Sequence, residues 1–285
     1  MSELAPSLRY TTVRPVAGHN RYPLRLIISL GVCILVLGWA LWPTLFTGID
    51  PLLGNPAQSL QPPSLAHWFG TDHLGRDLYS RTVHGTALSL SATSMAVLVA
   101  LILGSLIGIL GGFFGGWLDS ALTRLIEVLM AIPSLLLSMA VITVLGFGTL
   151  NIALAVGLSS VATFARIARG EVLRWKSRAF VEAAQTCGVS PLRVIQRHIF
   201  PHIAGPILAL AALEFGTAVL AVSALSFLGF GAPPPQPEWG LLVSEGRNYM
   251  VAAWWYTTLP GLVIASVVLA TNQLAKSLQN RQGAY

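Results

Sequence analysis

The sequence predicts an all-α membrane protein with six transmembrane helices and both termini in the cytoplasm. Of its 285 residues, 54% are hydrophobic and 10% are charged, whereas a soluble domain carries about 25% charged residues. The apolar residues form long runs rather than the periodic stripes of a water-soluble core. The positive charges also gather between alternate runs, as they do on the cytoplasmic side of membrane proteins.

Six stretches are apolar over a length that crosses a bilayer, which takes about 20 helical residues. In chain order they are Leu26 to Phe46, Leu88 to Gly112, Ala121 to Leu145, Leu150 to Ala165, Ile203 to Gly229 and Tyr256 to Leu274. The fourth is short and ends at Arg166, whose side chain can extend the span by snorkelling to the headgroups. Pro133 predicts a bend in the third, because proline removes one backbone hydrogen bond.

The lysines and arginines orient these spans. Of the 17 in the chain, all but Arg76, Arg81 and Arg247 fall on the side of the two termini. Positive residues are retained on the cytoplasmic side, so both termini are expected there. The net charge of +6 then reflects membrane orientation. The expected partner of these charges is membrane lipid and not nucleic acid.

The predicted organisation follows from the spans and the two long connections between them. It consists of a cytoplasmic tail (1–25), the first transmembrane helix (26–46), an external loop with an interfacial helix (47–86), a membrane core of five helices (87–275) and a cytoplasmic tail (276–285). The core includes a long cytoplasmic loop (166–202).

That cytoplasmic loop has charged and apolar residues interleaved at helical spacing, with a break near Gly188. The pattern predicts two short amphipathic helices, with Ser190 as the N-cap of the second and Pro191 at its first position. Such a surface either binds a protein partner or lies on the inner leaflet against anionic lipid. The pattern alone leaves both interpretations open.

A family resemblance favours the protein partner. Glu182-Ala183-Ala184, followed by three residues, Gly188 and then Pro201, resembles the Glu-Ala-Ala loop of importer permeases of the ATP-binding-cassette class. In that family this loop couples the permease to its ATPase, with the glycine forming the turn. The coupling residues expected here are Glu182, Ala183, Ala184, Gly188, Arg193, Arg197 and Pro201. His198 stands where the general pattern has isoleucine, which is similar to the peptide and nickel branch.

Two further motifs resemble the second permease of dipeptide, oligopeptide and nickel importers. One runs from His67 to Arg81, and the other from Leu225 to Gly240. Their motif residues are Gly70, Thr71, Asp72, Gly75, Arg76, Asp77, Arg81, Glu238, Trp239 and Gly240. The resemblance covers roughly Pro63 to Asn272, and the C-terminal tail departs from it.

Independently of the family, the charges of the first external motif alternate in sign along the chain. Asp72, Arg76, Asp77 and Arg81 predict a short surface helix with ion pairs worth a few tenths of a kcal/mol each. Trp68 and Tyr79 are expected to anchor this helix at the outer interface.

The resemblance implies a type I importer permease fold in the bacterial inner membrane. It also implies three kinds of partner: a second homologous permease, two cytoplasmic ATP-binding subunits and an external solute-binding protein. ATP and magnesium would be held by the ATPase subunits, with no cofactor on this chain. Peptides are the expected solute, with nickel or a metal chelate as the alternative.

No serine, cysteine or paired-carboxylate arrangement in the sequence suggests catalysis. Its two lysines, Lys176 and Lys276, do not fit a Gly-x4-Gly-Lys phosphate loop, so it is not expected to hydrolyse ATP. No catalytic residues are predicted. The spacing of His67, His73 and His84 matches no standard metal site, so no metal ligands are predicted either.

Within the spans, Glu214 and Pro133 are candidates for the translocation path. An ionisable group inside a membrane is costly and points to function, although Glu214 could instead hydrogen-bond to another helix. Glu127 is expected to pair with Arg124, three residues earlier. Gly104, Gly108, Gly112 and Gly116 form a ridge for close helix packing, against this chain or another.

Two other classes of protein remain open. A secondary transporter driven by an ion gradient would show inverted repeats and broken helices near the midplane, and the two halves of this chain show no evident similarity. A membrane enzyme or scaffold would use the basic loop for docking without transport.

Overall fold

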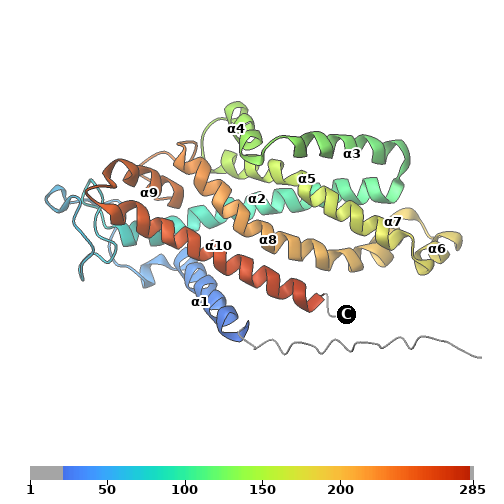
Figure 1. The fold of residues 1–285 in the computed structure, drawn as a ribbon, viewed down its shortest axis with the longest axis horizontal. Helices are drawn as coiled ribbons and strands as arrows, with labels where there is room; N and C mark the ends of the chain where they lie inside the picture. The colour runs from blue at the N-terminus through green and yellow to red at the C-terminus, as the bar shows by residue number, and fades with distance from the viewer. Residues whose placement is uncertain (1–21, 283–285) are drawn as a thin grey trace, which may run out of the picture.

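Long helices run side by side along one axis of the molecule, with short helices at both ends (Figure 1). The computed structural model describes residues 22–282. Its helices are α1 (Tyr22–Leu41), α2 (Leu78–Phe114), α3 (Gly116–Ala131), α4 (Ser134–Leu145), α5 (Thr149–Lys176), α6 (Ala179–Thr186), α7 (Pro191–Val194), α8 (Phe200–Phe227), α9 (Trp239–Gly246) and α10 (Trp254–Gln282). Short 3₁₀ turns lie at Pro43–Leu45, Pro56–Gln58 and Arg247–Tyr249, and a π-helical turn at Ile195–Ile199 joins α7 to α8. The N-terminal tail falls almost wholly outside the described residues.

The helices confirm the expected all-helical membrane protein. Five of them, α1, α2, α5, α8 with the turn before it, and α10, are long and apolar enough to cross a membrane, and the broken pair α3–α4 makes a sixth if it counts as one span. Each predicted stretch coincides with one of these helices or with the pair. Most of the helices extend beyond the apolar runs, most clearly α2, which has 37 residues and begins at Leu78. Helix α1 instead ends at Leu41, before the predicted end at Phe46.

The third stretch differs from the expected bent helix. Its two halves meet at 97° around Ile132 and Pro133, and Ile132 adopts an extended conformation with ψ 129°. A residue before proline is disfavoured in the helical region because of the proline ring. The chain therefore turns sharply here, and α4 begins anew at Ser134.

Helices α2 and α5 form the most closely packed pair of helices, because the glycine ridge of α2 lies at their contact. A Cβ on Gly104 would meet Phe164, one on Gly108 would meet Ala165, and one on Gly112 would meet Arg169. The glycines of α2 thus let the two backbones approach within this chain. Gly116, the fourth of the series, lies beyond the end of α2 with φ +62°, and a Cβ added there would have no atom within 4 Å.

These contacts also fix the direction of the two helices. Gly157 lies against Ala96 near the start of α5, whereas Gly112 lies against Arg169 and Val172 near its end. Residue numbers rise together, so α2 and α5 run parallel. The intervening α3–α4 segment therefore returns the chain from the end of α2 to the level at which α5 begins.

A bulky side chain in the glycine ridge is expected to separate α2 from α5. In Gly108→Val, the new side chain would overlap the Ala165 carbonyl and the Ala168 side chain, which costs about 1–3 kcal/mol or more as overpacking. The apparent Tm of the detergent-purified chain should fall by several degrees. Gly170→Ala is the control, because that helical glycine has open space around it; equal Tm values for the two variants would contradict the packing assignment.

Candidate functional site

The Glu-Ala-Ala loop is predicted over residues 166–202, but α5 continues to Lys176 and α8 begins at Phe200. The segment between them forms the end of the molecule that is labelled α6 and α7 in Figure 1. Helix α6 ends at Thr186, and the chain turns at Gly188, whose φ is +78°. Helix α7 begins at Pro191, as predicted. Ser190 occupies the N-cap position, also as predicted, with an extended backbone, although its side chain makes no capping hydrogen bond.

The loop has a buried face and an exposed face. Val181, Val194 and Ile199 are fully buried in a cluster with Val172 of α5 and Ile203 of α8. These residues are covered by the chain itself, whereas Phe180, Leu192 and Phe200 of the same segment remain exposed. Among the predicted coupling residues, Ala184 is half-buried, and the following are exposed: Glu182, Ala183, Gly188, Arg193, Arg197 and Pro201. The structure thus gathers the predicted residues into one accessible surface.

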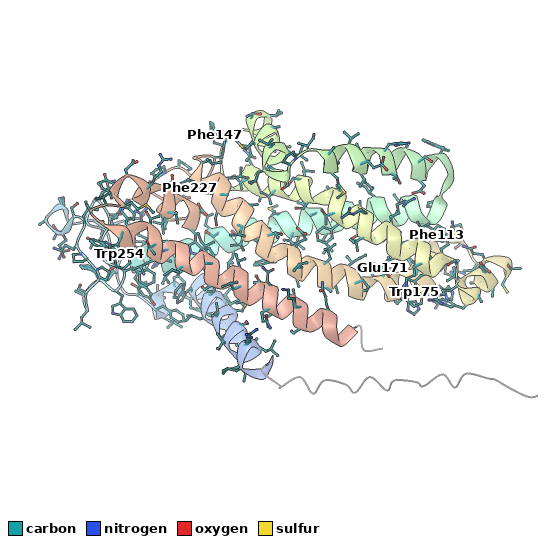
Figure 2. The ribbon with its side chains drawn as sticks, in the orientation of Figure 1. Phe113, Phe147, Glu171, Trp175, Phe227 and Trp254 are labelled. Atoms are coloured by element: carbon teal, nitrogen blue, oxygen red, sulfur yellow. The ribbon has the colours of Figure 1, made fainter. Side chains whose placement is uncertain are left out.

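An aromatic stack joins this loop to the long helices. The ring of Trp175, at the end of α5, lies 4.1 Å from that of His202 at the start of α8, and Phe180 of α6 packs beside both. Arg174 and Arg178 lie over the face of Trp175, at 6.0 and 5.6 Å. Trp175 is labelled at this end of the molecule in Figure 2, far from Trp254. Sequence reasoning missed this stack, although the aromatic residues that flank the loop are its visible signal.

The opposite end of the molecule contains both family motifs. Asp72, Arg76 and Arg81 are almost completely buried. Arg81 Nη1 donates to Asp72 Oδ2 at 2.5 Å and to Glu245 Oε2 of α9 at 2.9 Å. Arg76 Nε donates to Asp72 Oδ2 at 2.6 Å. We call the group of Asp72, Arg76, Arg81 and Glu245 the buried ion network.

This network corrects the expectation of an exposed surface helix. Residues 70–77 form turns, and α2 begins only at Leu78, with Asp77 as its N-cap through a hydrogen bond from the Ser80 N–H. The oppositely charged side chains pair with one another within this turn, and the arginines also pair with Glu245 on α9. Trp68, one of the two expected interfacial anchors, is largely exposed and packs on Tyr79, the other, with ring centroids 4.9 Å apart.

The network keeps Asp72 ionised. Burial by itself would raise the pKa of this carboxyl, but the Arg76 N–H, the Arg81 guanidinium and the Arg76 side chain together lower the pKa below its ordinary value. The stabilisation it contributes is therefore present above the pKa of an unfolded aspartate and is lost only as the pH falls through the lowered value.

The second family motif contacts the part of α2 that directly follows the first motif, at separations of 149 and 157 residues along the chain. Glu238 is fully buried and caps α9 by accepting hydrogen bonds from the N–H groups of Gly240 and Leu241. It also accepts one from Ser89 of α2, and the indole of Trp239 donates to the Thr82 carbonyl. Burial raises the pKa of the Glu238 carboxyl despite these donors. The two motifs therefore fasten α9 to the first turns of α2.

The three histidines of this region have separate partners. His67 lies 2.8 Å from Asp77, His73 stacks on Tyr249 and contacts the Tyr256 hydroxyl, and His84 contacts the Ser80 carbonyl. Within residues 22–282, no group of three or more His, Cys, Asp or Glu side chains is arranged to hold a metal ion.

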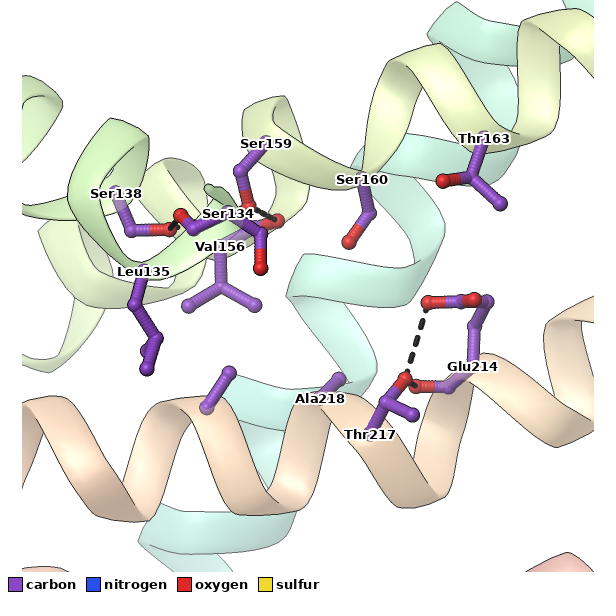
Figure 3. A pocket seen from close by; sticks show the side chains of 11 residues that line it. Ser134, Leu135, Ser138, Val156, Ser159, Ser160, Thr163, Glu214, Thr217 and Ala218 are labelled. Carbon is purple, nitrogen blue, oxygen red and sulfur yellow. Dashed lines mark hydrogen bonds between the residues drawn. The ribbon is translucent and has the colours of Figure 1, made fainter. Parts of the chain in front are cut away.

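A polar cavity of about 250 Å³ lies between α4, α5 and α8, and Figure 3 shows its lining. Most of its polar groups are hydroxyls: Ser134 and Ser138 from α4, Ser159, Ser160 and Thr163 from α5, and Thr217 from α8. Ser138 donates to the Ser134 carbonyl and to Ser159, which joins α4 to α5. Pro133 does not line the cavity itself, but the break it makes places Ser134 at the cavity wall.

Glu214 supplies the one carboxylate of this lining. It lies near the middle of α8, and Oε2 accepts a hydrogen bond of 3.0 Å from Thr217 on the same helix (Figure 3). The alternative that Glu214 bonds to another helix has no support among the described residues. Arg124 and Glu127 pair at 3.1 Å on the surface of α3, as predicted.

Sequence reasoning identified Glu214 but missed the hydroxyl residues around it. Serine and threonine are common in membrane helices, where their hydroxyls bond to a carbonyl in the preceding turn, so a single one carries no signal. Sequence reasoning also missed the pairing of Arg169 with Asp119, whose two bonds of 2.5 and 2.7 Å tie α5 to α3. The hydroxyl lining and this ion pair both form only because particular helices pack together in the tertiary structure.

Known proteins match this chain in sequence. The family model described as "Binding-protein-dependent transport system inner membrane component" matches residues 100–283. The dipeptide transport system permease protein of Alkalihalophilus pseudofirmus is 36% identical over 281 residues, which cover 96% of this chain and 91% of that protein. The glutathione transport system permease protein of Shigella flexneri is 44% identical over 218 residues, which cover 76% and 72%.

Solved structures match the fold. An inward-facing form of the MetNI methionine ABC transporter superposes with a TM-score of 0.55 at 14% identity, covering 70% of this chain and 96% of that one. An amino acid ABC transporter crystallised with histidines gives a TM-score of 0.55 at 16% identity, covering 71% and 94%. At this level of identity the likeness concerns the fold alone.

Proposed function

The chain belongs to the family of binding-protein-dependent transport system inner membrane components, and from that premise we propose that the solutes it carries are di- or oligopeptides. As a member of this family it is a multi-pass inner-membrane permease of an ATP-binding-cassette importer. It has no ATPase domain of its own, and ATP is bound by partner ATPases. The alternatives of a secondary transporter and of a membrane enzyme or scaffold are set aside.

The peptide assignment rests on one observation. The relative that aligns over 96% of this chain is named for dipeptide transport, and the relative at 44% identity is named for transport of glutathione, itself a tripeptide. The hydroxyl-rich cavity agrees with a solute that offers amide and carbonyl groups.

The proposed topology has six crossings and both termini in the cytoplasm. The parallel course of α2 and α5 requires α3–α4 to bring the chain back, so the broken pair is counted as one crossing. The excess of lysine and arginine places the α6–α7 end inside. The segment 47–86 and α9 then face outward, and residues 87–275 form the core.

The partners are proposed from this topology. A second homologous permease would complete the path on the open side of the cavity. Two cytoplasmic ATP-binding subunits would each dock on one permease, on this one through Glu182, Gly188, Arg193 and their exposed neighbours. An external solute-binding protein would dock at the opposite end, where Leu65, Val251 and Trp254 are exposed.

In the proposed coupling mechanism, movement of α6 is transmitted to the cavity through helices α5 and α8. The aromatic stack of Trp175, Phe180 and His202 connects α6 to the ends of α5 and α8. These are two of the three helices that line the cavity. A displacement of α6 by a closing ATPase would therefore move two cavity walls as rigid helices, which is how ATP hydrolysis would switch the access of the path.

The test is affinity purification of this chain from gently solubilised membranes, followed by identification of the proteins that remain bound. A second permease and ATPase subunits are expected, and the binding protein made with them should bind di- or oligopeptides in calorimetry. A chain that purifies without an ATPase would contradict the proposed partners. A binding protein that prefers nickel or a chelate would contradict the peptide assignment alone.

A further inference from the structure

Glu214 differs from the other acidic residues of the candidate spans because it has no cationic partner among residues 22–282. Three others form ion pairs within the chain: Asp119 with Arg169, Glu127 with Arg124, and Glu171 with Arg174. Among residues 22–282, the carboxylate of Glu214 is bonded only to the Thr217 hydroxyl. An ionised carboxylate at this depth is costly unless a counter-charge or water accompanies it.

We propose that Glu214 binds the α-ammonium group of the transported peptide as it passes through the cavity. This inference rests on the proposed peptide function and adds the residue that recognises the solute within the membrane. The carboxylate faces into the cavity rather than into the packed core (Figure 3). A primary ammonium supplies the missing positive charge together with three hydrogen-bond donors.

The rest of the lining favours a peptide main chain. Each hydroxyl of Ser160, Thr163 and their neighbours can donate to a carbonyl or accept from an amide. Hydroxyls therefore bind the repeating part of any peptide without regard to its side chains. The α-ammonium group is likewise common to all free peptides, so Glu214 and the hydroxyls together would select for peptides as a class rather than for one sequence.

The position of Glu214 suits a transient site. Helices α4, α5 and α8 each contribute one wall of the cavity. Two of these helices connect to the proposed ATPase-docking loop through Trp175 and His202. Movement of that loop would shift α5 and α8 relative to α4, and the changed distance between Glu214 on α8 and the hydroxyls of Ser134 and Ser138 on α4 would release a bound ammonium group.

The experiment uses the complete importer with its binding protein in proteoliposomes, and the probes are dialanine and lysyl-alanine. In Glu214→Gln, which keeps size but removes charge, dialanine uptake should fall at least about tenfold, because a hydrogen bond to a charged group is lost. ATPase stimulation by the loaded binding protein should persist. Glu214→Asp should retain more uptake than Glu214→Gln, since it keeps the charge.

Glu127→Gln is the matched control, because it makes the same change at a paired, exposed glutamate, and uptake should match that of the wild type. Wild-type uptake by Glu214→Gln, or uptake that ranks Gln above Asp, would overturn the inference. A loss confined to lysyl-alanine would assign the carboxylate to a side-chain cation and overturn it as well. Wild-type importer that carries neither peptide would instead refute the proposed function itself.

Discussion

An importer that carries Gly188→Pro is expected to insert and assemble normally but to lose solute uptake. The chain turns at Gly188 with φ +78°, whereas proline is confined to φ of about −65°. The turn between α6 and α7 therefore has to change its course. A strained backbone position costs about 1–3 kcal/mol, which corresponds to about a 5- to 150-fold loss if docking requires the native turn. Uptake by proteoliposomes and the amount of inserted chain are the two measurements.

Two milder substitutions distinguish the effect of backbone conformation at Gly188 from the effect of side-chain size. No atom lies within 4 Å of a Cβ placed on Gly188, so size alone is not the constraint. Asparagine tolerates the left-handed region better than alanine does, and Gly188→Asn should therefore retain more uptake than Gly188→Ala. Normal uptake by Gly188→Pro would refute the assignment of this loop to coupling.

Arg81→Leu is expected to destabilise the outer end of the molecule severely. Arg81 bonds to both Asp72 and Glu245, so its loss leaves the buried Asp72 and the partly buried Glu245 with only Arg76 between them. Removal of one partner from a buried ion pair costs about 3–5 kcal/mol. Thermal unfolding of the purified importer should show an apparent Tm lower by at least about 5 °C.

Arg124→Leu provides the control for that experiment. It removes the same kind of side chain from the ion pair with Glu127, in which both side chains are more than half exposed. Exposed ion pairs of this kind contribute little to the free energy of unfolding. Its Tm should stay within about 1 °C of the wild type. Because the pKa of Asp72 is lowered, the deficit of Arg81→Leu should persist unchanged from neutral pH to about pH 5. Equal Tm values for the two variants would show that the network is not a structural element.

The coupling surface could be predicted from the sequence because the features that define it are local. A turn at Gly188, a helix start at Pro191 and alternating apolar and charged residues depend on neighbours within a few positions. The buried ion network could not be predicted from local sequence features. Asp72, Arg76 and Arg81 looked like exposed helix pairs, and only Glu245, 164 residues from Arg81, together with the packing of Tyr256, encloses them.

The sequence by itself determined the helical membrane class, the approximate spans, their charge asymmetry and the family, because each depends on residue type along a short stretch or on a recognisable motif. Tertiary structure alone decided that the glycine ridge of α2 packs against α5, that the chain breaks sharply at Pro133, and that three helices enclose hydroxyls around Glu214. These features depend on which surfaces meet. The energy of a charge or a hydroxyl is set by what surrounds it in space, and residues distant in the chain supply those surroundings.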